Sequence, residues 1–101
     1  MNVLLISSSH ITSNLIHNML PDDYIKTTTN GNITIPSNTE LIIVEEDLLT
    51  KNVLDKDYKT LVITRNATVE LVKKVVSDGK LYIVAPFTQQ MLLSRIQSLV
   101  G

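Results

Sequence analysis

The stretch DGKLYIVAPF, residues 78–87, carries the pattern on which the fold prediction rests. Four consecutive apolar residues, Leu81 to Val84, lie between a glycine at position 79 and a proline at position 86. A continuous apolar run, rather than an alternating one, is typical of a strand that is buried on both faces of a parallel sheet. The stretch therefore predicts a short buried strand over residues 81–84.

Three further apolar runs along the chain have the same character, at residues 3–6, 41–44 and 61–63. A fifth segment, residues 24–28 (YIKTT), is more polar, as expected of an edge strand. Residues 29–39 are rich in Asn, Thr, Gly and Pro and predict turns rather than a helix.

Between these strands lie segments whose apolar residues recur with helical spacing. The first predicted helix ends before Pro21 and uses Ile11, Leu15, Ile16 and Met19. The next begins at Asn66 as N-cap, ends at Gly79 and uses Val69, Leu71, Val72, Val75 and Val76. The last starts near Thr88 and uses Met91, Leu92, Ile96 and Leu99. A short helix over residues 46–56 would use Leu48, Leu49, Val53 and Leu54.

Strands that alternate with helices predict right-handed crossovers and a parallel sheet with helices on both faces. Functional groups of such a sheet gather at the carboxyl ends of its strands. The length of 101 residues and the ordinary balance of 44% apolar and 19% charged residues predict one domain, residues 1–101.

Charge and cysteine content narrow the classes of function. The net charge of −1 gives no bulk attraction to nucleic acid or membrane, although residues 1–58 carry −5 and residues 59–101 carry +4. That asymmetry fits either a polarised, self-associating surface or chance. The chain has no cysteine, which excludes disulfides and thiolate catalysis. The apolar run at residues 3–6 is too short for a signal peptide, so we expect a cytoplasmic location.

The segment 78–87 is followed by LLSRI at residues 92–96. Together they closely resemble the end of a response-regulator receiver domain, above all of the OmpR/PhoB type, in which a strand ends in Lys-Pro-Phe and the next helix reads Leu-Leu-x-Arg-Ile. The resemblance implies a flavodoxin-like (CheY-like) α/β fold with a five-stranded parallel sheet and helices on both faces. The second helix would be shortened or replaced by a loop, since the resemblance is absent over residues 29–39.

The resemblance also implies where a phosphorylation pocket would lie. The acidic pair that binds magnesium corresponds to Ser7 and Ser8, the phosphoacceptor aspartate to Glu45, and the invariant lysine to Ala85. Mg²⁺ needs several hard oxygen ligands, and phosphoryl transfer needs positive charge on the phosphoryl oxygens. Two serine hydroxyls are poor substitutes for two carboxylates, and an alanine methyl group supplies no positive charge. We therefore expect a degenerate pocket without phosphorylation, catalytic residues, metal or cofactor, and a chain that is not an enzyme.

Two switch positions of the receiver pattern are retained as Thr64 and Tyr82, and Pro86 is expected to follow a cis peptide bond. Thr64 and Tyr82 could be a coupled pair or ordinary strand residues. Glu45 could mimic a phosphoaspartate permanently, with Arg65 as the nearby cation, or be a solvated carboxylate.

The run SSSH, residues 7–10, permits a second interpretation from a different class. It could cradle a phosphate or another small anion at a helix N-terminus. It also faintly resembles the loop of phosphotransferase-system IIB proteins, with Ser7 in place of their cysteine, which would make the chain a degenerate phosphocarrier. The alternative is a pair of capping hydroxyls. His10 and His17 have no evident third partner, so no metal site is expected.

A charged face is predicted over the helix at 66–79, the strand at 81–84 and the helix at 88–100. In OmpR/PhoB-type receivers this face forms a symmetric dimer, and a solvated face is the alternative. Its residues here are Glu70, Lys73, Lys74, Asp78, Lys80, Tyr82 and Arg95. We therefore expect a regulatory or dimerisation module of a transcriptional regulator, with a protein or a second copy as partner. DNA would be contacted only by a separate effector domain outside this chain, and no membrane is expected.

Overall fold

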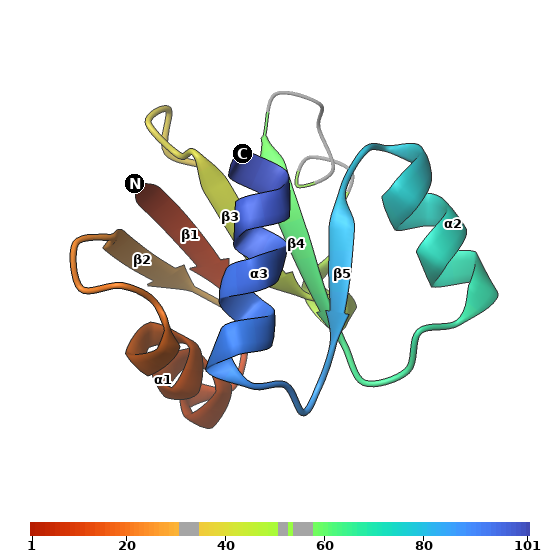
Figure 1. Cartoon of the computed structure of the whole chain (residues 1–101), viewed down its shortest axis with the longest axis horizontal. Coiled ribbons are helices and arrows are strands. Elements are labelled where there is room, and N and C mark those ends of the chain that lie inside the picture. Colours follow the sequence, from red (N-terminus) through yellow and green to blue (C-terminus); the bar gives the residue numbers. More distant parts are fainter. Residues whose placement is uncertain (31–34, 51–52, 54–57) are drawn as a thin grey trace.

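The computed structural model describes residues 1–30, 35–50, 53 and 58–101. Strands and helices alternate along most of the chain (Figure 1). In chain order the elements are β1 (Asn2–Ile6), α1 (His10–Met19), β2 (Ile25–Thr29), β3 (Leu41–Glu45), the 3-10 helix η1 (Glu46–Leu48), β4 (Lys59–Thr64), α2 (Val69–Ser77), β5 (Leu81–Val84) and α3 (Gln89–Val100).

The five strands form one sheet in the order β2-β1-β3-β4-β5, and every neighbouring pair is parallel. The predicted strands are confirmed, with β2 starting after Tyr24 and reaching Thr29. Because all strands run the same way, their carboxyl ends lie along one edge of the sheet. Strand β5 is an edge strand, so the run at 81–84 is less enclosed than predicted, and Val84 is exposed.

Alternate side chains of the central strands enter two apolar cores, one on each face of the sheet. Helices α1 and α3 cover the first core, which contains Leu5, Ile43 and Ile83. Helix α2 covers part of the second core, which contains Ile6, Val44 and Val62. The continuous apolar runs are explained by this burial on both faces.

The helices differ from the predicted apolar stripes in three places. In α1, Ile16 is buried but Ile11 and Leu15 are 75% and 54% exposed. In α2, Leu71 and Val75 are buried, whereas Val69 and Val76 are exposed. In α3, Leu92 and Ile96 are buried, whereas Met91 is exposed. Each helix packs on only one side of the sheet, so residues at the margins of its stripe remain in contact with solvent.

Helix caps explain where the last two helices begin. The predicted N-cap Asn66 is wrong: α2 starts two residues later, where the Thr68 hydroxyl accepts a hydrogen bond from the Leu71 amide at 3.2 Å. The predicted start of the last helix near Thr88 is confirmed, and the Thr88 hydroxyl caps α3 by accepting a hydrogen bond from the Met91 amide at 3.2 Å. Gly79 follows α2 with a φ of +74°, in the left-handed region that glycine adopts without strain.

Two predicted segments lie partly outside the described residues. Between β2 and β3, positions 30 and 35–40 contain no helix, in line with the shortened second helix. The helix predicted over 46–56 is described only at 46–50 and 53, where it is limited to the single turn η1. None of the helices in the described ranges has the length and hydropathy needed to span a membrane.

Polar side chains hold α1 to its neighbours at its C-terminal end. The Lys26 ammonium of β2 donates to the carbonyl oxygens of His17 and Leu20 at 3.4 and 3.5 Å. The Gln89 side-chain amide, at the start of α3, donates to the Met19 carbonyl at 2.9 Å. These contacts satisfy carbonyl groups that a helix end leaves unpaired.

Candidate functional site

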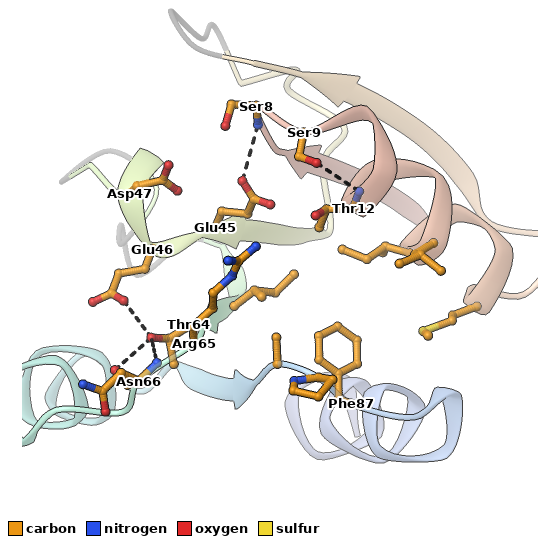
Figure 2. A pocket seen from close by; sticks show the side chains of 16 residues that line it. Ser8, Ser9, Thr12, Glu45, Glu46, Asp47, Thr64, Arg65, Asn66 and Phe87 are labelled. Atoms are coloured by element: carbon orange, nitrogen blue, oxygen red, sulfur yellow. Dashed lines mark hydrogen bonds between the residues drawn. The ribbon is translucent and has the colours of Figure 1, made fainter.

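A hollow of about 820 Å³ lies at the carboxyl ends of the strands, between α1, the start of η1 and the connection from β5 to α3 (Figure 2). One part of its wall is polar and consists of Ser8, Ser9, Thr12, Glu45, Glu46, Asp47, Thr64, Arg65 and Asn66. The other part is apolar and consists of Leu15, Ile16, Met19, Ile63, Ala85, Pro86 and Phe87. Four of the five positions predicted for the degenerate pocket are brought together here, and Ser7 is not among them.

Ser7 is buried behind the wall of the hollow. Its hydroxyl accepts a hydrogen bond from the Ser9 amide at 3.1 Å and donates to the Ser9 carbonyl at 3.2 Å. Ser9 in turn caps α1, because its hydroxyl accepts from the Thr12 amide at 3.3 Å. The serine run therefore builds a turn and a helix cap, and the Ser9 and Thr12 amides already have acceptors within the chain.

Glu45 reaches across the hollow from the end of β3. One of its carboxylate oxygens accepts a long hydrogen bond, 3.4 Å, from the Ser8 amide. Arg65 also lines the hollow. Within the described residues, no hydrogen bond or ion pair joins Glu45 to Arg65. The arrangement thus lacks the paired cation that the mimic interpretation of Glu45 calls for.

The hydroxyl of Thr64 is bonded to a carboxylate, but the carboxylate is that of Glu46. Thr64 Oγ1 donates to Glu46 Oε1 at 2.6 Å (Figure 2). Thr64 Oγ1 also accepts a hydrogen bond from the Asn66 amide at 3.1 Å, and it lies 3.0 Å from the Asn66 carbonyl oxygen. Thr64 is buried and Glu46 is exposed, so a surface carboxylate holds a buried hydroxyl at the end of β4.

Sequence reasoning singled out Glu45 and missed Glu46. Strand β3 ends at Glu45, which pairs with Ile63, and Glu46 begins η1 close to the end of β4, where Thr64 lies. Only an assumed register between residues 41–45 and 59–64 could have identified this contact.

The other switch position, Tyr82, lies away from the hollow. Its side chain is partly buried against the core on the α2 side of the sheet. Its carbonyl accepts from the Arg95 guanidinium at 3.3 Å. Ala85 lines the hollow, and the Ala85–Pro86 peptide bond is cis. Thr64 and Tyr82 are on adjacent strands, and alternation along these strands places both on the face of the sheet that α2 covers.

The predicted charged face includes Lys80, and the structure corrects this assignment. The side chain is buried, with 4% exposure, and its ammonium donates to the carbonyl of Tyr58 just before β4. It stabilises the packing at the start of β5 and cannot present a charge to a partner. The other charged members are exposed: Glu70, Lys73, Lys74, Asp78 and Arg95.

The magnesium ion that the receiver resemblance implies does not fit the side chains at this site. Ser7 directs its hydroxyl to the Ser9 backbone, and Ser8 offers a neutral hydroxyl where a carboxylate would be needed. In the parts of the chain that the structure describes, no group of three or more His, Cys, Asp or Glu side chains is placed to hold a metal ion.

Comparisons with known proteins agree on the fold. No protein-family model and no curated protein matches the sequence. Among solved structures, the ChxR receiver domain of Chlamydia trachomatis is 23% identical, with a TM-score of 0.78 over 99% of this chain and 98% of that one.

Two further solved structures show the same arrangement. The chemotaxis response regulator CheY4 of Vibrio cholerae is 19% identical, with a TM-score of 0.78 over 98% of both chains. A pilus assembly protein CpaE from Caulobacter crescentus is 16% identical, with a TM-score of 0.68 over 97% of this chain and 92% of that one. The strand order and these likenesses together lead to one conclusion: the chain has the CheY-like fold of response-regulator receiver domains.

Proposed function

We propose that the chain is a receiver-like regulatory module that works without phosphorylation and acts through contact with a protein partner or a second copy. The observation that carries the proposal is the 2.6 Å hydrogen bond from the Thr64 hydroxyl to the Glu46 carboxylate. The receiver resemblance makes Thr64 the residue that would respond to a phosphoryl group. Here a carboxylate of the same chain already accepts the hydrogen bond that this hydroxyl can donate.

The strength of this contact supports a constant state rather than an inducible one. An O–H···O⁻ bond of 2.5–2.7 Å is short and about twice as strong as a neutral hydrogen bond. The changes at Ser7, Ser8 and Ala85 remove the groups that would bind magnesium and the phosphoryl oxygens. The pocket therefore has an occupied switch residue and lacks the groups that phosphorylation needs.

The surface formed by α2, β5 and α3 is the proposed contact region. It combines exposed apolar side chains, Val76 and Val84, with the charged residues Lys74, Asp78 and Arg95. A two-fold interface would bring opposite charges of two copies together. Exposed ion pairs contribute only about 0–1 kcal/mol each, so the apolar residues must supply most of the binding free energy. The resemblance to OmpR/PhoB-type receivers supports a role in transcription control through a separate DNA-binding domain.

Treatment with acetyl phosphate and Mg²⁺, followed by intact-mass measurement, tests the loss of phosphorylation. We expect an unchanged mass, and unchanged amide spectra with beryllofluoride and Mg²⁺. A receiver that retains the acidic pair, the aspartate and the lysine serves as the positive control. A mass gain of one phosphoryl group, with spectral changes at Thr64 and Tyr82, would contradict the proposal.

Sedimentation over a range of concentrations tests self-association through the α2–β5–α3 surface. We expect dimers that weaken when Arg95→Glu reverses a charge on this surface. Asp22→Lys, a charge reversal in the exposed turn before β2, at the opposite edge of the sheet, is the matched control and should leave the association unchanged. A chain that stays monomeric at high concentration would remove the second copy as a partner.

A further inference from the structure

We propose that the hollow at the strand ends binds a small apolar cation, meaning an organic amine or guanidine that carries a hydrophobic group. The inference rests on the proposed function, in that it assigns a ligand to a pocket that no longer carries a phosphoryl group. It follows from three properties of the hollow, namely its apolar wall, its acidic wall and its size.

The apolar wall is formed by α1 and the residues after β5. Leu15 and Met19, four positions apart on α1, line the hollow together with Phe87. Leu15 is 54% exposed although it lies beside the buried Ile16. Ala85 adds only a methyl group to this wall. A hydrophobic ligand group placed here would cover apolar surface that the fold itself leaves in contact with water.

The acidic wall lies directly after β3. Three carboxylates line it, those of Glu45, Glu46 and Asp47, against one cation, Arg65, so the lining charge is −2. Glu46 is engaged by Thr64. Glu45 holds only the long bond from the Ser8 amide, and in the described part of the chain Asp47 has no hydrogen bond or ion pair. Two carboxylates are therefore available to a positively charged group, and an anion is disfavoured.

The size of the hollow favours a small molecule over a polypeptide segment. A volume of about 820 Å³ lies within the range of roughly 300–1,000 Å³ that is usual for small-molecule sites. A ligand would point its hydrophobic group toward Met19 and leave its charge near Glu45 and Asp47.

A titration followed by protein NMR tests the site with four matched probes. Phenethylammonium carries both the ring and the charge, 2-phenylethanol has only the ring, ethylammonium has only the charge, and 3-phenylpropanoate has the opposite charge. We expect saturable shifts at Leu15, Met19, Phe87 and Asp47 with phenethylammonium, and binding about tenfold weaker or worse for the other three.

Two substitutions localise the charge contact. Asp47→Asn and Glu45→Gln should each weaken phenethylammonium binding several-fold and leave the thermal unfolding midpoint close to that of the parent chain. Asp22→Asn, in an exposed turn outside the hollow, is the control and should not change the affinity. Equal binding of the alcohol and the ammonium, absence of saturable shifts, or saturation by a basic peptide alone would overturn the inference.

The outcome is independent of the phosphorylation test. The titration contains no Mg²⁺ and no phosphodonor, so a failed titration leaves an unchanged mass with acetyl phosphate as it stands. A chain that accepts a phosphoryl group and also binds phenethylammonium would contradict the proposed function alone.

Discussion

The buried centre of the sheet and the loops at its carboxyl edge are built from the same strands but differ in what they depend on. In the centre, Leu5, Ile43 and Leu61 are fully enclosed and pair in register with their neighbours. At the edge, the properties of the site depend on a few polar contacts, such as Thr64 with Glu46. The receiver-like fold is therefore compatible with a pocket whose polar residues have changed, because those residues contribute little to the cores.

The largest expected effect separates the two regions by stability. Leu92→Ala removes a fully buried side chain of α3 and should lower the free energy of unfolding by about 2–5 kcal/mol. Leu15→Ala, at the rim of the hollow, should change it by less than about 1 kcal/mol because Leu15 is more than half exposed. Denaturant unfolding measures both. Equal losses would mean that the rim is part of the core.

A buried hydrogen bond near the amino end of β4 should show the next largest effect on the free energy of unfolding. The Thr60 hydroxyl, fully buried, donates to the Val53 carbonyl at 2.8 Å. Thr60→Val keeps the shape and leaves that carbonyl without its partner, at a cost of about 1–3 kcal/mol. Thr27→Val, on exposed β2, is the matched control and should be nearly neutral in the same unfolding experiment. A neutral Thr60→Val would show that the bond contributes nothing.

Substitutions at Gly79 test the cost of a positive φ in the backbone, at a turn that belongs to neither region. A methyl group would meet no atom within 4 Å there, so the cost of Gly79→Ala comes from the positive φ and should be about 1–2 kcal/mol. Gly79→Asn should cost less, because asparagine tolerates this conformation better than alanine. If both variants unfold like the parent chain, the turn after α2 has shifted to a different conformation.

The smallest stability effect is expected at the edge itself. Glu46→Gln should lower the free energy of unfolding by less than about 1 kcal/mol, since Glu46 is exposed. The amide NMR spectrum of the Glu46→Gln variant should nevertheless change at Thr64 and Asn66. Glu45→Gln should instead affect Ser8 and leave those two signals in place. The reverse pattern would show that Glu45, and not Glu46, is the hydrogen-bond partner of Thr64.

The central strands could be predicted from the sequence because burial on both faces leaves a continuous apolar run in each, as in residues 41–44, whereas the arrangement of the sheet followed from the resemblance to receiver domains. The N-cap of α2 was harder, since Asn66 and Thr68 are both good capping residues and only the hydrogen bond to Leu71 decides between them. A two-residue ambiguity of this kind does not alter the fold.

The site was less predictable because its contacts depend on register and side-chain direction. Glu45 and Glu46 are chemically alike, and only the hydrogen bond from the Thr64 hydroxyl shows which of the two reaches it. Lysine is usually a surface residue, yet the Lys80 ammonium reaches the Tyr58 carbonyl inside the fold. The hollow itself depends on the exposure of Leu15, which helical spacing places on the buried side.

The Thr64 hydroxyl has a single proton and two acceptors within reach, the Glu46 carboxylate at 2.6 Å and the Asn66 carbonyl at 3.0 Å. Rotation about one bond moves that proton from an oxygen of the exposed 3-10 turn to an oxygen of the chain leading into α2. The hydroxyl is thus a rotor with two rest positions, and the charge on Glu46 sets their relative populations. Neutralising that one surface oxygen would turn the rotor toward α2 without moving any strand.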